Sequence, residues 1–391
     1  MACLNLKNQI YLQTYDPNNP QLIRIESSVA TLSPNSRKYD YFYIQFSNDT
    51  SFKHFPISKI VPPDILEKIK EQKVYLLLDN GLEYFLSTVE SIYNDIIIKE
   101  GIPPTQIIFL SAVPTMIETV KATAKKYNKE EIILEWFSLF EHTGQDAILK
   151  RNNMPVLEKK KKYGKKKFLN LNRRWRIHRP LMTILLHNFN LLENGYISMA
   201  RSDDGMDWNR AIHRLKHMYS DDETILKIIN DNQEKIKSLP EMYLDTKDLV
   251  TNRAIHEESI NEYYKETYFS LISETTYHEN IPFFSEKVFK AMAMGHPFLL
   301  VTAPRSLQYL KKLGYKTFHP LIDETYDTID DPGKRMMAIV KEVERLCKLD
   351  KAQLKEWLAK IRPIANDNYT RLKNKRFLSK MMNYKHHFNA P

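Results

Sequence analysis

The sequence predicts an α/β protein of two domains, each built around a parallel sheet. Short apolar runs alternate with amphipathic stretches in both halves of the chain, as they do in parallel sheets covered by helices. A strongly basic segment without apolar runs separates the two halves. A chain of 391 residues with 42% hydrophobic content is also long enough to bury two cores.

The first half, residues 1–150, is expected to form a β-α-β domain with helices on both faces of its sheet. Its predicted strands are 41–46, 74–78, 106–110 and 131–137. Its predicted helices are 63–71, 88–99 and 115–127. A basic linker is expected at 151–165, because four consecutive lysines do not pack into a core.

The strand and helix alternation resumes in a second domain, expected at 166–350. Its predicted strands are 168–172, 196–200, 268–275, 296–302 and 316–318. Its predicted helices are 179–192, 306–313, 332–349 and one that begins at Ser285, while 208–264 is helical and polar by its periodicity. The last part, 351–391, is expected to be a helical tail, and its return to the first domain is left open.

The positive charge of the chain is concentrated in two segments. The formal net charge is +10, but the 21 residues from Lys159 to Arg179 carry +11 and include no acid. A second acid-free segment, Arg371 to Pro391, holds six more Lys and Arg residues. This local basicity indicates a polyanionic partner or a phosphate-bearing ligand. The lysines expected to contact nucleic acid are Lys159, Lys160, Lys161, Lys162, Lys165 and Lys166.

Composition excludes several classes of protein. No two of the nine glycines are closer than ten residues, so neither the dinucleotide fingerprint nor the Walker phosphate loop is present. Two cysteines cannot build a zinc cluster or a disulfide framework, which fits a reducing compartment. No apolar run reaches the ~18 residues of a membrane-spanning helix, and the N-terminus lacks a signal-peptide profile. We therefore expect a soluble cytoplasmic protein.

The segment 268–300 carries the clearest pattern for a binding site. An apolar strand ends at Glu274, and after a loop Ser285 stands at the N-cap position of a helix. The dipole and free amides of a helix start attract phosphate, Lys287 adds a positive charge, and Glu286 can accept from two sugar hydroxyls. Together these groups suit a nucleotide diphosphate with its ribose. The plain alternative is an acid and a solvated lysine at an ordinary helix start.

This segment resembles the donor-binding signature of GT-B glycosyltransferases, especially the family-ten fucosyltransferases. The matching residues are Ser273-Glu274-Thr275 at the strand end, Ser285-Glu286-Lys287 at the helix start and Gly295-His296-Pro297-Phe298 before the next strand. The resemblance implies two Rossmann-like domains facing a cleft, with the acceptor on the first and the nucleotide sugar on the second. It gives the ribose to Glu286 and the phosphate to Lys287. The block 268–346 also resembles glycosyltransferases of tailed phages and large viruses, which implies the host-cell cytoplasm.

A second block, 165–180, is expected to complete the donor site. Fucosyltransferases open their second domain with a strand and an Asn- and Arg-bearing loop, and the resemblance brings those arginines to the donor phosphates. Arginine forks match phosphate oxygens, and ligands of open α/β sheets bind at strand ends. The alternative is a solvated basic linker, which we favour for the four lysines and not for the arginines. The expected donor-binding residues are Asn172, Arg173, Arg174, Arg179, Glu274, Ser285, Glu286 and Lys287.

The sequence lacks one common metal-binding motif of glycosyltransferases and offers several acids as the catalytic base. No two Asp residues are separated by a single residue, so the D-x-D metal clamp of GT-A transferases is absent, and we expect no obligatory divalent ion. An inverting transferase needs a carboxylate near the acceptor hydroxyl. Asp79, at the end of a predicted strand, is our candidate, although it could equally cap a turn. The other acids considered are Glu83, Glu135 and Glu141, the last beside His142.

The leading hypothesis is a transferase that moves a sugar from a UDP- or GDP-sugar to an acceptor hydroxyl. The resemblance to phage enzymes and the local basicity favour hydroxymethylated cytosine in double-stranded DNA as the acceptor. A protein or polysaccharide acceptor is the alternative within this class. The alternative from another class is a non-catalytic nucleic-acid-binding protein. Sugar, nucleotide, stereochemistry and oligomeric state are not predicted.

Overall fold

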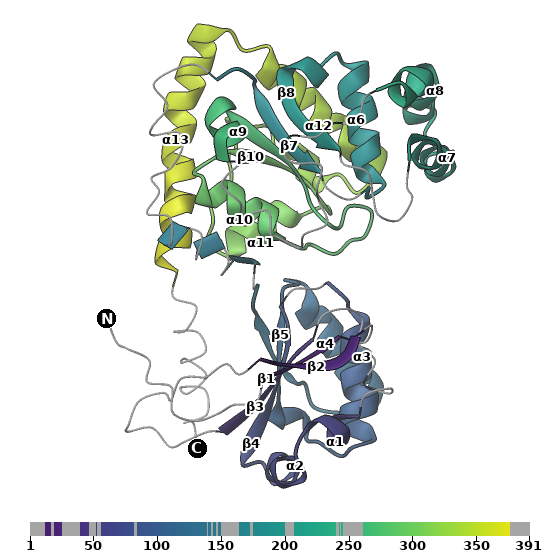
Figure 1. Ribbon diagram of the computed structural model, residues 1–391, viewed down its shortest axis with the longest axis vertical. Helices are drawn as coiled ribbons and strands as arrows, with labels where there is room; N and C mark the ends of the chain where they lie inside the picture. The colour runs from purple at the N-terminus through teal and green to yellow at the C-terminus, as the bar shows by residue number, and fades with distance from the viewer. Residues whose placement is uncertain are drawn as a thin grey trace. The chain divides into compact units, whose positions relative to one another are not determined.

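The computed structural model describes residues 12–16, 19–25, 40–46, 52, 56–81, 84–138, 140–141, 144–145, 148–149, 164–172, 175–199, 207–239, 242, 244 and 261–375. The described residues up to 138 belong to one compact unit, unit 1, and residues 140–375 to a second, unit 2 (Figure 1). Each unit contains a largely parallel sheet, and a long helix follows the second sheet, which confirms the predicted α/β class with a helical C-terminal part. The roles expected for the two domains, and the cleft between them, stay predictions.

Unit 1 contains a six-stranded sheet in the order β2-β1-β3-β4-β5-β6. The strands are β1 (Leu12–Asp16), β2 (Asn19–Ile25), β3 (Asp40–Phe46), β4 (Val74–Asn80), β5 (Ile107–Ser111) and β6 (Ile133–Trp136). Only β1 and β2 pair antiparallel, and all other neighbours are parallel. The four predicted strands are confirmed as β3 to β6, whereas the β1–β2 hairpin was not predicted.

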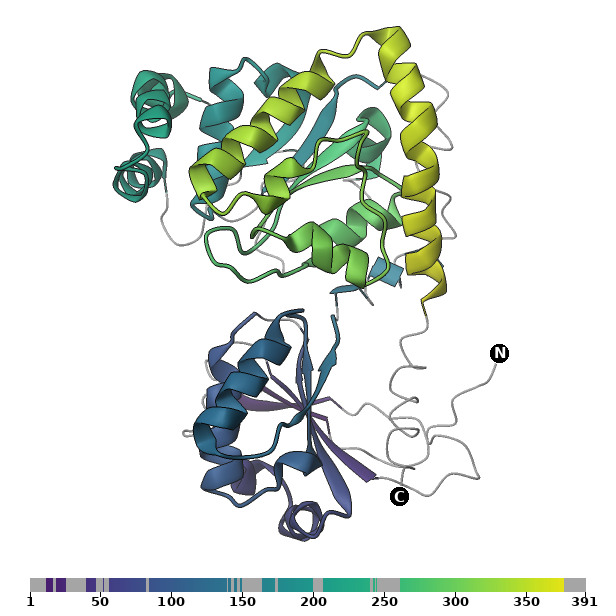
Figure 2. The same ribbon diagram turned by 180° about the vertical axis from the view of Figure 1, so that it is seen from behind.

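The helices of unit 1 connect strands that follow one another in a single direction. They are α1 (Ile57–Ile60), α2 (Pro63–Lys70), α3 (Ser87–Ser91), the π-helix η1 (Ile92–Ile98), the 3-10 turn η2 (Pro104–Gln106) and α4 (Met116–Tyr127). Because β3 to β6 lie in sequence order, right-handed crossovers put these helices on one face, where Figures 1 and 2 draw α1, α3 and α4. The expectation that helices cover both faces of this sheet is therefore wrong for the described helices of unit 1.

Unit 2 contains a four-stranded parallel sheet in the order β10-β9-β7-β8. The strands are β7 (Phe168–Asn172), β8 (Gly195–Met199), β9 (Phe269–Ser273) and β10 (Phe298–Val301). The chain runs from β7 to β8 on one side, then crosses to β9 and β10 on the other, so the strand order reverses between β7 and β9. This is the doubly wound topology of nucleotide-binding folds.

Helices cover both faces of the unit 2 sheet. The helices are α6 (His178–Asn188), α7 (Trp208–Met218), α8 (Glu223–Lys237), α9 (Asn261–Glu266), α10 (Glu286–Ala293), α11 (Ser306–Lys312), α12 (Pro332–Cys347) and α13 (Lys351–Asn374), with 3-10 turns at Leu192–Asn194 and Thr325–Thr328. Helices α6 and α12 pack together on one face, and α10 lies on the other with α13 against it (Figures 1 and 2). None of the helices in the described ranges has the length and apolar character needed to cross a membrane.

Two sequence predictions were wrong in detail. The predicted strand 316–318 is an irregular connection, because side chains satisfy its backbone: Asn368 bonds both the N–H and the carbonyl of Lys316, at 2.8 Å each. The carboxylate of Glu324 likewise accepts from the N–H of Phe318. The predicted single helix 88–99 is a short α-helix that continues as the π-helix η1.

Asp327, in the turn before α12, gives unit 2 a titrating group within the physiological range. Its buried carboxylate accepts from the N–H of Leu307 in α11, and burial raises its pKa from 3.8 to about 6. The folded state therefore holds this proton more tightly, and the associated stability is lost as the pH rises through about 6. We expect the stability of Asp327→Asn relative to the wild type to increase by roughly 2 to 3 kcal/mol as the pH rises from 4 to 7. Urea unfolding of both proteins across that range tests this, and a constant difference would contradict it.

Candidate functional site

The carboxyl ends of β7 and β9 define the candidate site. β7 ends at Asn172 and β9 at Ser273, and the strand order reverses between them. The connections after these strands leave in opposite directions, and ligands of open α/β sheets bind in the crevice that forms there. In unit 1, β3 to β6 show no such reversal. The topology therefore places the candidate ligand-binding crevice in unit 2.

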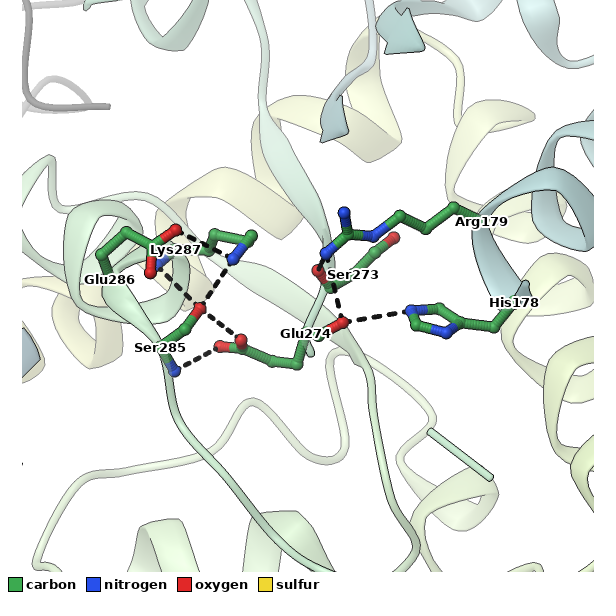
Figure 3. A network of polar contacts seen from close by, with 7 residues as sticks. All are labelled: His178, Arg179, Ser273, Glu274, Ser285, Glu286 and Lys287. Carbon is green, nitrogen blue, oxygen red and sulfur yellow. Dashed lines mark hydrogen bonds and ion pairs between the residues drawn. The ribbon is translucent and has the colours of Figure 1, made fainter. Parts of the chain in front are cut away.

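Glu274, the residue after β9, is buried and closes the loop between β9 and α10. One carboxylate oxygen, Oε1, accepts from the N–H of Ser285 at 3.2 Å, and Oε2 accepts from the Ser285 hydroxyl at 2.5 Å (Figure 3). Burial raises the pKa of Glu274 above its ordinary value, although the nearby Lys287 charge and the bonds from Ser285 act in the opposite direction. The loop thus returns to the strand end that it left.

Ser285 caps α10 and holds the side chain that follows it. Its hydroxyl oxygen accepts from the backbone N–H of Lys287 at 3.4 Å and from the Lys287 ammonium at 2.9 Å. That ammonium also pairs with the carboxylate of Glu286 at 2.9 Å, with the two side chains 15% and 17% exposed. Burial disfavours the Glu286 anion, but the Lys287 charge and hydrogen bonds outweigh this and lower the pKa of Glu286. A helix start with one ammonium and one carboxylate is therefore accessible beside the crevice.

Arg179 and His178 begin α6 on the other side of the crevice. The guanidinium of Arg179 donates to the carbonyl oxygens of Ser273 and Glu274, at 3.1 and 3.3 Å, and its side chain is buried. His178 Nε2 lies 3.1 Å from the same Glu274 carbonyl (Figure 3). Because a carbonyl only accepts, Nε2 carries the proton. Burial and the neighbouring Arg179 charge hold the pKa of His178 well below its ordinary value, so this imidazole is neutral.

Sequence reasoning missed Arg335, which contacts Tyr277 in the loop between β9 and α10. The Tyr277 ring stacks on His178, with centroids 5.1 Å apart, and the Arg335 guanidinium lies 4.5 Å from the centre of the same Tyr277 ring. Arg335 also donates to the Tyr277 carbonyl at 2.6 Å. No local pattern marks the contact of Arg335 with Tyr277, because the two residues lie 58 positions apart in the sequence.

The basic residues expected at the site divide into three groups. Arg173, Arg174 and Lys159 to Lys162 lie outside the described residues. Lys165 and Lys166 precede β7 at the amino edge of the sheet, opposite the crevice, and pair with Glu266 at 2.6 Å and Glu193 at 3.5 Å. Only Arg179 and Lys287 are therefore brought to the candidate site among the described residues.

Asp79, the candidate base, lies near the end of β4 in unit 1. Its Oδ1 accepts from the N–H of Gly81 at 2.8 Å, so its carboxylate does close a turn. A methyl group on Gly81 would come within 2.8 Å of Phe137 and 2.9 Å of that Oδ1, so a larger residue at this position would force one of these side chains to move. Asp79 is buried, and its catalytic role stays a prediction.

The other acids considered as bases are placed differently. Glu141 belongs to unit 2, where its buried carboxylate accepts from Tyr315 and pairs with Lys375. Glu135 lies in β6, whereas Glu83 and His142 are outside the described residues. Within the described ranges, no group of three or more His, Cys, Asp or Glu side chains is arranged to hold a metal ion.

Comparison with known proteins gives distant similarities only. No protein-family model and no curated protein matches the chain. Similar solved structures include the GtfA/B complex, at 10% identity over 88% of this chain and 57% of that chain, with a TM-score of 0.45. Others are a glycosyltransferase from Rickettsia africae (12% identity, 89% and 77% covered, TM-score 0.41) and sucrose-phosphate synthase from Thermosynechococcus elongatus (12%, 89% and 74%, TM-score 0.42). The chain thus spans little more than half of the first of these, and none of them assigns it an activity.

Proposed function

We propose that this protein is a glycosyltransferase that moves a sugar from a nucleotide-diphosphate sugar to an acceptor hydroxyl. The observation that carries the proposal is the linked set Glu274, Ser285 and Lys287 at the start of α10, beside the strand-order reversal. A diphosphate would meet the amides of the α10 start and the Lys287 ammonium. The Glu286 carboxylate would accept from two ribose hydroxyls. The motif resemblance of this segment to fucosyltransferases supports the same assignment.

These groups also suit the chemistry of the transfer. Breaking the bond between sugar and phosphate leaves negative charge on the departing diphosphate, and fixed positive groups stabilise that charge. The ammonium of Lys287 is held by Ser285 before any ligand arrives, so little reorganisation is needed. We therefore propose that α10 and Lys287, with Arg173 and Arg174 as further candidates, neutralise the leaving group without an obligatory divalent ion.

The acceptor is a separate part of the proposal. Hydroxymethylated cytosine in phage DNA is our expected acceptor, with protein and polysaccharide as alternatives. The described lysines give DNA no support, because Lys165 and Lys166 are paired with acids at the far edge of the sheet. Incubating the protein with UDP- and GDP-sugars and with plain or hydroxymethylcytosine-containing DNA, followed by nucleoside mass spectrometry, decides this point. A mass gain on modified DNA alone supports the DNA acceptor, and no gain with any sugar rejects it.

Donor binding can be tested without knowing the acceptor. We expect UDP or GDP at millimolar concentration to raise the thermal unfolding midpoint of the wild-type protein by several degrees, because a ligand that binds only the folded state stabilises it. Adenosine and free phosphate serve as controls for nonspecific effects. If neither nucleotide shifts the midpoint, the transferase proposal fails. A non-catalytic nucleic-acid-binding protein is then the favoured hypothesis.

A further inference from the structure

Two buried asparagines on β7 form a hydrogen-bonded chain that ends at the crevice. Asn170 and Asn172 lie on the same face of the strand and are 0% and 1% exposed. Asn170 Nδ2 donates to the Leu271 carbonyl of the neighbouring strand β9 at 2.6 Å. Asn172 Nδ2 donates to Asn170 Oδ1 at 2.5 Å. The chain thus runs from β9 to the last residue of β7, along the boundary where the strand order reverses.

The direction of each amide in this chain is fixed by chemistry. The Leu271 carbonyl can only accept, so the Asn170 atom facing it must be the NH₂ group. The other end of the Asn170 amide is then its oxygen, and the Asn172 atom that meets it must be an NH₂ group as well. Neither amide can be reversed without two like atoms facing each other. Asn172 is therefore oriented with its oxygen, Oδ1, at the end of the chain.

Asn172 Oδ1 is buried and has no hydrogen-bond partner within the part of the chain that the structure describes. A buried carbonyl oxygen without a donor costs about 1 to 3 kcal/mol, which is why such atoms are uncommon in folded proteins. This oxygen can accept but cannot donate, so it does not suit a phosphate, whose oxygens are acceptors too. It suits a hydroxyl or a ring N–H.

We propose that Asn172 Oδ1 accepts a hydrogen bond from an O–H or N–H group of the donor, on its nucleoside or on its sugar, and that Asn170 is the positioning residue that fixes this acceptor. The inference rests on the proposed function and refines the role of Asn172, which the sequence placed near the donor diphosphate. The site then has two parts. Lys287 and the start of α10 bind the charged diphosphate, and Asn172 accepts a hydrogen bond from a neutral part of the same ligand.

Three ligands of increasing size separate these parts. Pyrophosphate carries charge but neither nucleoside nor sugar, UDP or GDP adds the nucleoside, and UDP-glucose or GDP-mannose adds a sugar. We expect Asn172→Ala to weaken binding of the nucleoside diphosphate by about three- to tenfold, while pyrophosphate affinity stays within about twofold of the wild type. If the sugar is the partner instead, only the nucleotide sugar loses affinity. Isothermal titration calorimetry with each ligand measures this.

Ser198→Ala is the matched control for this experiment. The Ser198 hydroxyl accepts from the backbone N–H of Asn172 at 3.1 Å but does not touch the amide chain. Its loss perturbs the same strand end without moving Oδ1, so all three affinities should stay near those of the wild type. The unfolding midpoint of each variant without ligand shows whether the variant folds.

Asn170→Ala tests the positioning role. Without Asn170 Oδ1, the Asn172 amide is free to turn and present its NH₂ group to the ligand. We expect the ratio of nucleotide to pyrophosphate affinity to fall by about three- to tenfold, a change that a general loss of stability would not produce. Equal weakening of all three ligands by Asn172→Ala, or no weakening of any, overturns the inference. Absence of nucleotide binding by the wild type overturns the proposed function itself.

Discussion

Replacing Arg335 by Met is expected to destabilise unit 2 by about 3 to 4 kcal/mol, the largest stability loss that we expect from a single substitution. Arg335 lies in the first turn of α12 with its side chain 1% exposed. Its guanidinium donates to the carbonyls of Ile329 and Asp330, at 2.7 and 2.9 Å, and to the Tyr277 carbonyl at 2.6 Å. Methionine fills similar volume but leaves these three carbonyls without their donor, and the contact with the Tyr277 carbonyl is buried. It also removes the cation above the Tyr277 ring.

Urea unfolding followed by tryptophan fluorescence measures this loss. Three of the four tryptophans, Trp175, Trp208 and Trp357, belong to unit 2, so the signal reports mainly on that unit. Lys334→Met, at the exposed neighbouring position, removes one charge without touching the carbonyls and should change stability by less than about 0.5 kcal/mol. A loss of stability below about 1 kcal/mol for Arg335→Met would mean that the contacts of the Arg335 guanidinium do not hold the loop between β9 and α10.

Arg335→Lys separates the charge of the side chain from its geometry. An ammonium keeps the positive charge but cannot reach three carbonyls from the fixed planar fork that a guanidinium provides. We therefore expect an intermediate loss. The same variant should also weaken nucleotide binding, because Tyr277 lies between Arg335 and His178, and His178 contacts the Glu274 carbonyl. Arg335 in α12 is thus connected to the end of β9 by contacts through Tyr277 and His178.

The sequence predicted the parts of the site that depend on neighbouring residues. Ser285, Glu286 and Lys287 form a helix start by local chemistry, and a strand followed by a capped helix is visible in a short window. The order of apolar and amphipathic stretches likewise predicted eight strands that the structure contains, with boundaries that differ by at most two residues. Local pattern therefore sufficed for most elements and for the start of α10.

The contacts that the sequence could not predict join residues far apart in the chain. Glu274 contacts Ser285, eleven positions later in the sequence, and Arg335 contacts Tyr277, 58 positions earlier. Pairing also gives Lys165 a partner that the sequence does not show, Glu266, about a hundred residues later, while the expected contact of Lys165 with nucleic acid stays a prediction. Charge and residue type are local properties, whereas the partner that neutralises a charge is set by the fold.

Lys287→Met is expected to have the largest effect on donor binding, about 10- to 100-fold in the dissociation constant of UDP or GDP. A charge-assisted contact to phosphate contributes about 1.5 to 3 kcal/mol, and methionine keeps the length of the side chain but neither its charge nor its donors. Pyrophosphate should lose affinity by a similar factor, unlike in Asn172→Ala. Lys341→Met, at an exposed position of α12, is the matched control for loss of one charge and should bind all ligands normally. An unchanged pyrophosphate affinity in Lys287→Met would place the diphosphate elsewhere.

Variants of Ser285 and Glu274 show how much of the donor affinity depends on where the Lys287 ammonium is held, as distinct from its charge. Ser285→Ala keeps the Lys287 ammonium but removes the hydroxyl that holds it at 2.9 Å, so we expect a smaller loss of affinity, about three- to tenfold. Glu274→Leu leaves both the N–H and the hydroxyl of Ser285 without their acceptor and should match or exceed that loss. Glu274→Gln keeps an acceptor for the Ser285 N–H and should lie between the wild type and Glu274→Leu. An order of loss from Lys287→Met through Glu274→Leu to Glu274→Gln indicates that charge binds the diphosphate while the buried carboxylate holds that charge in place.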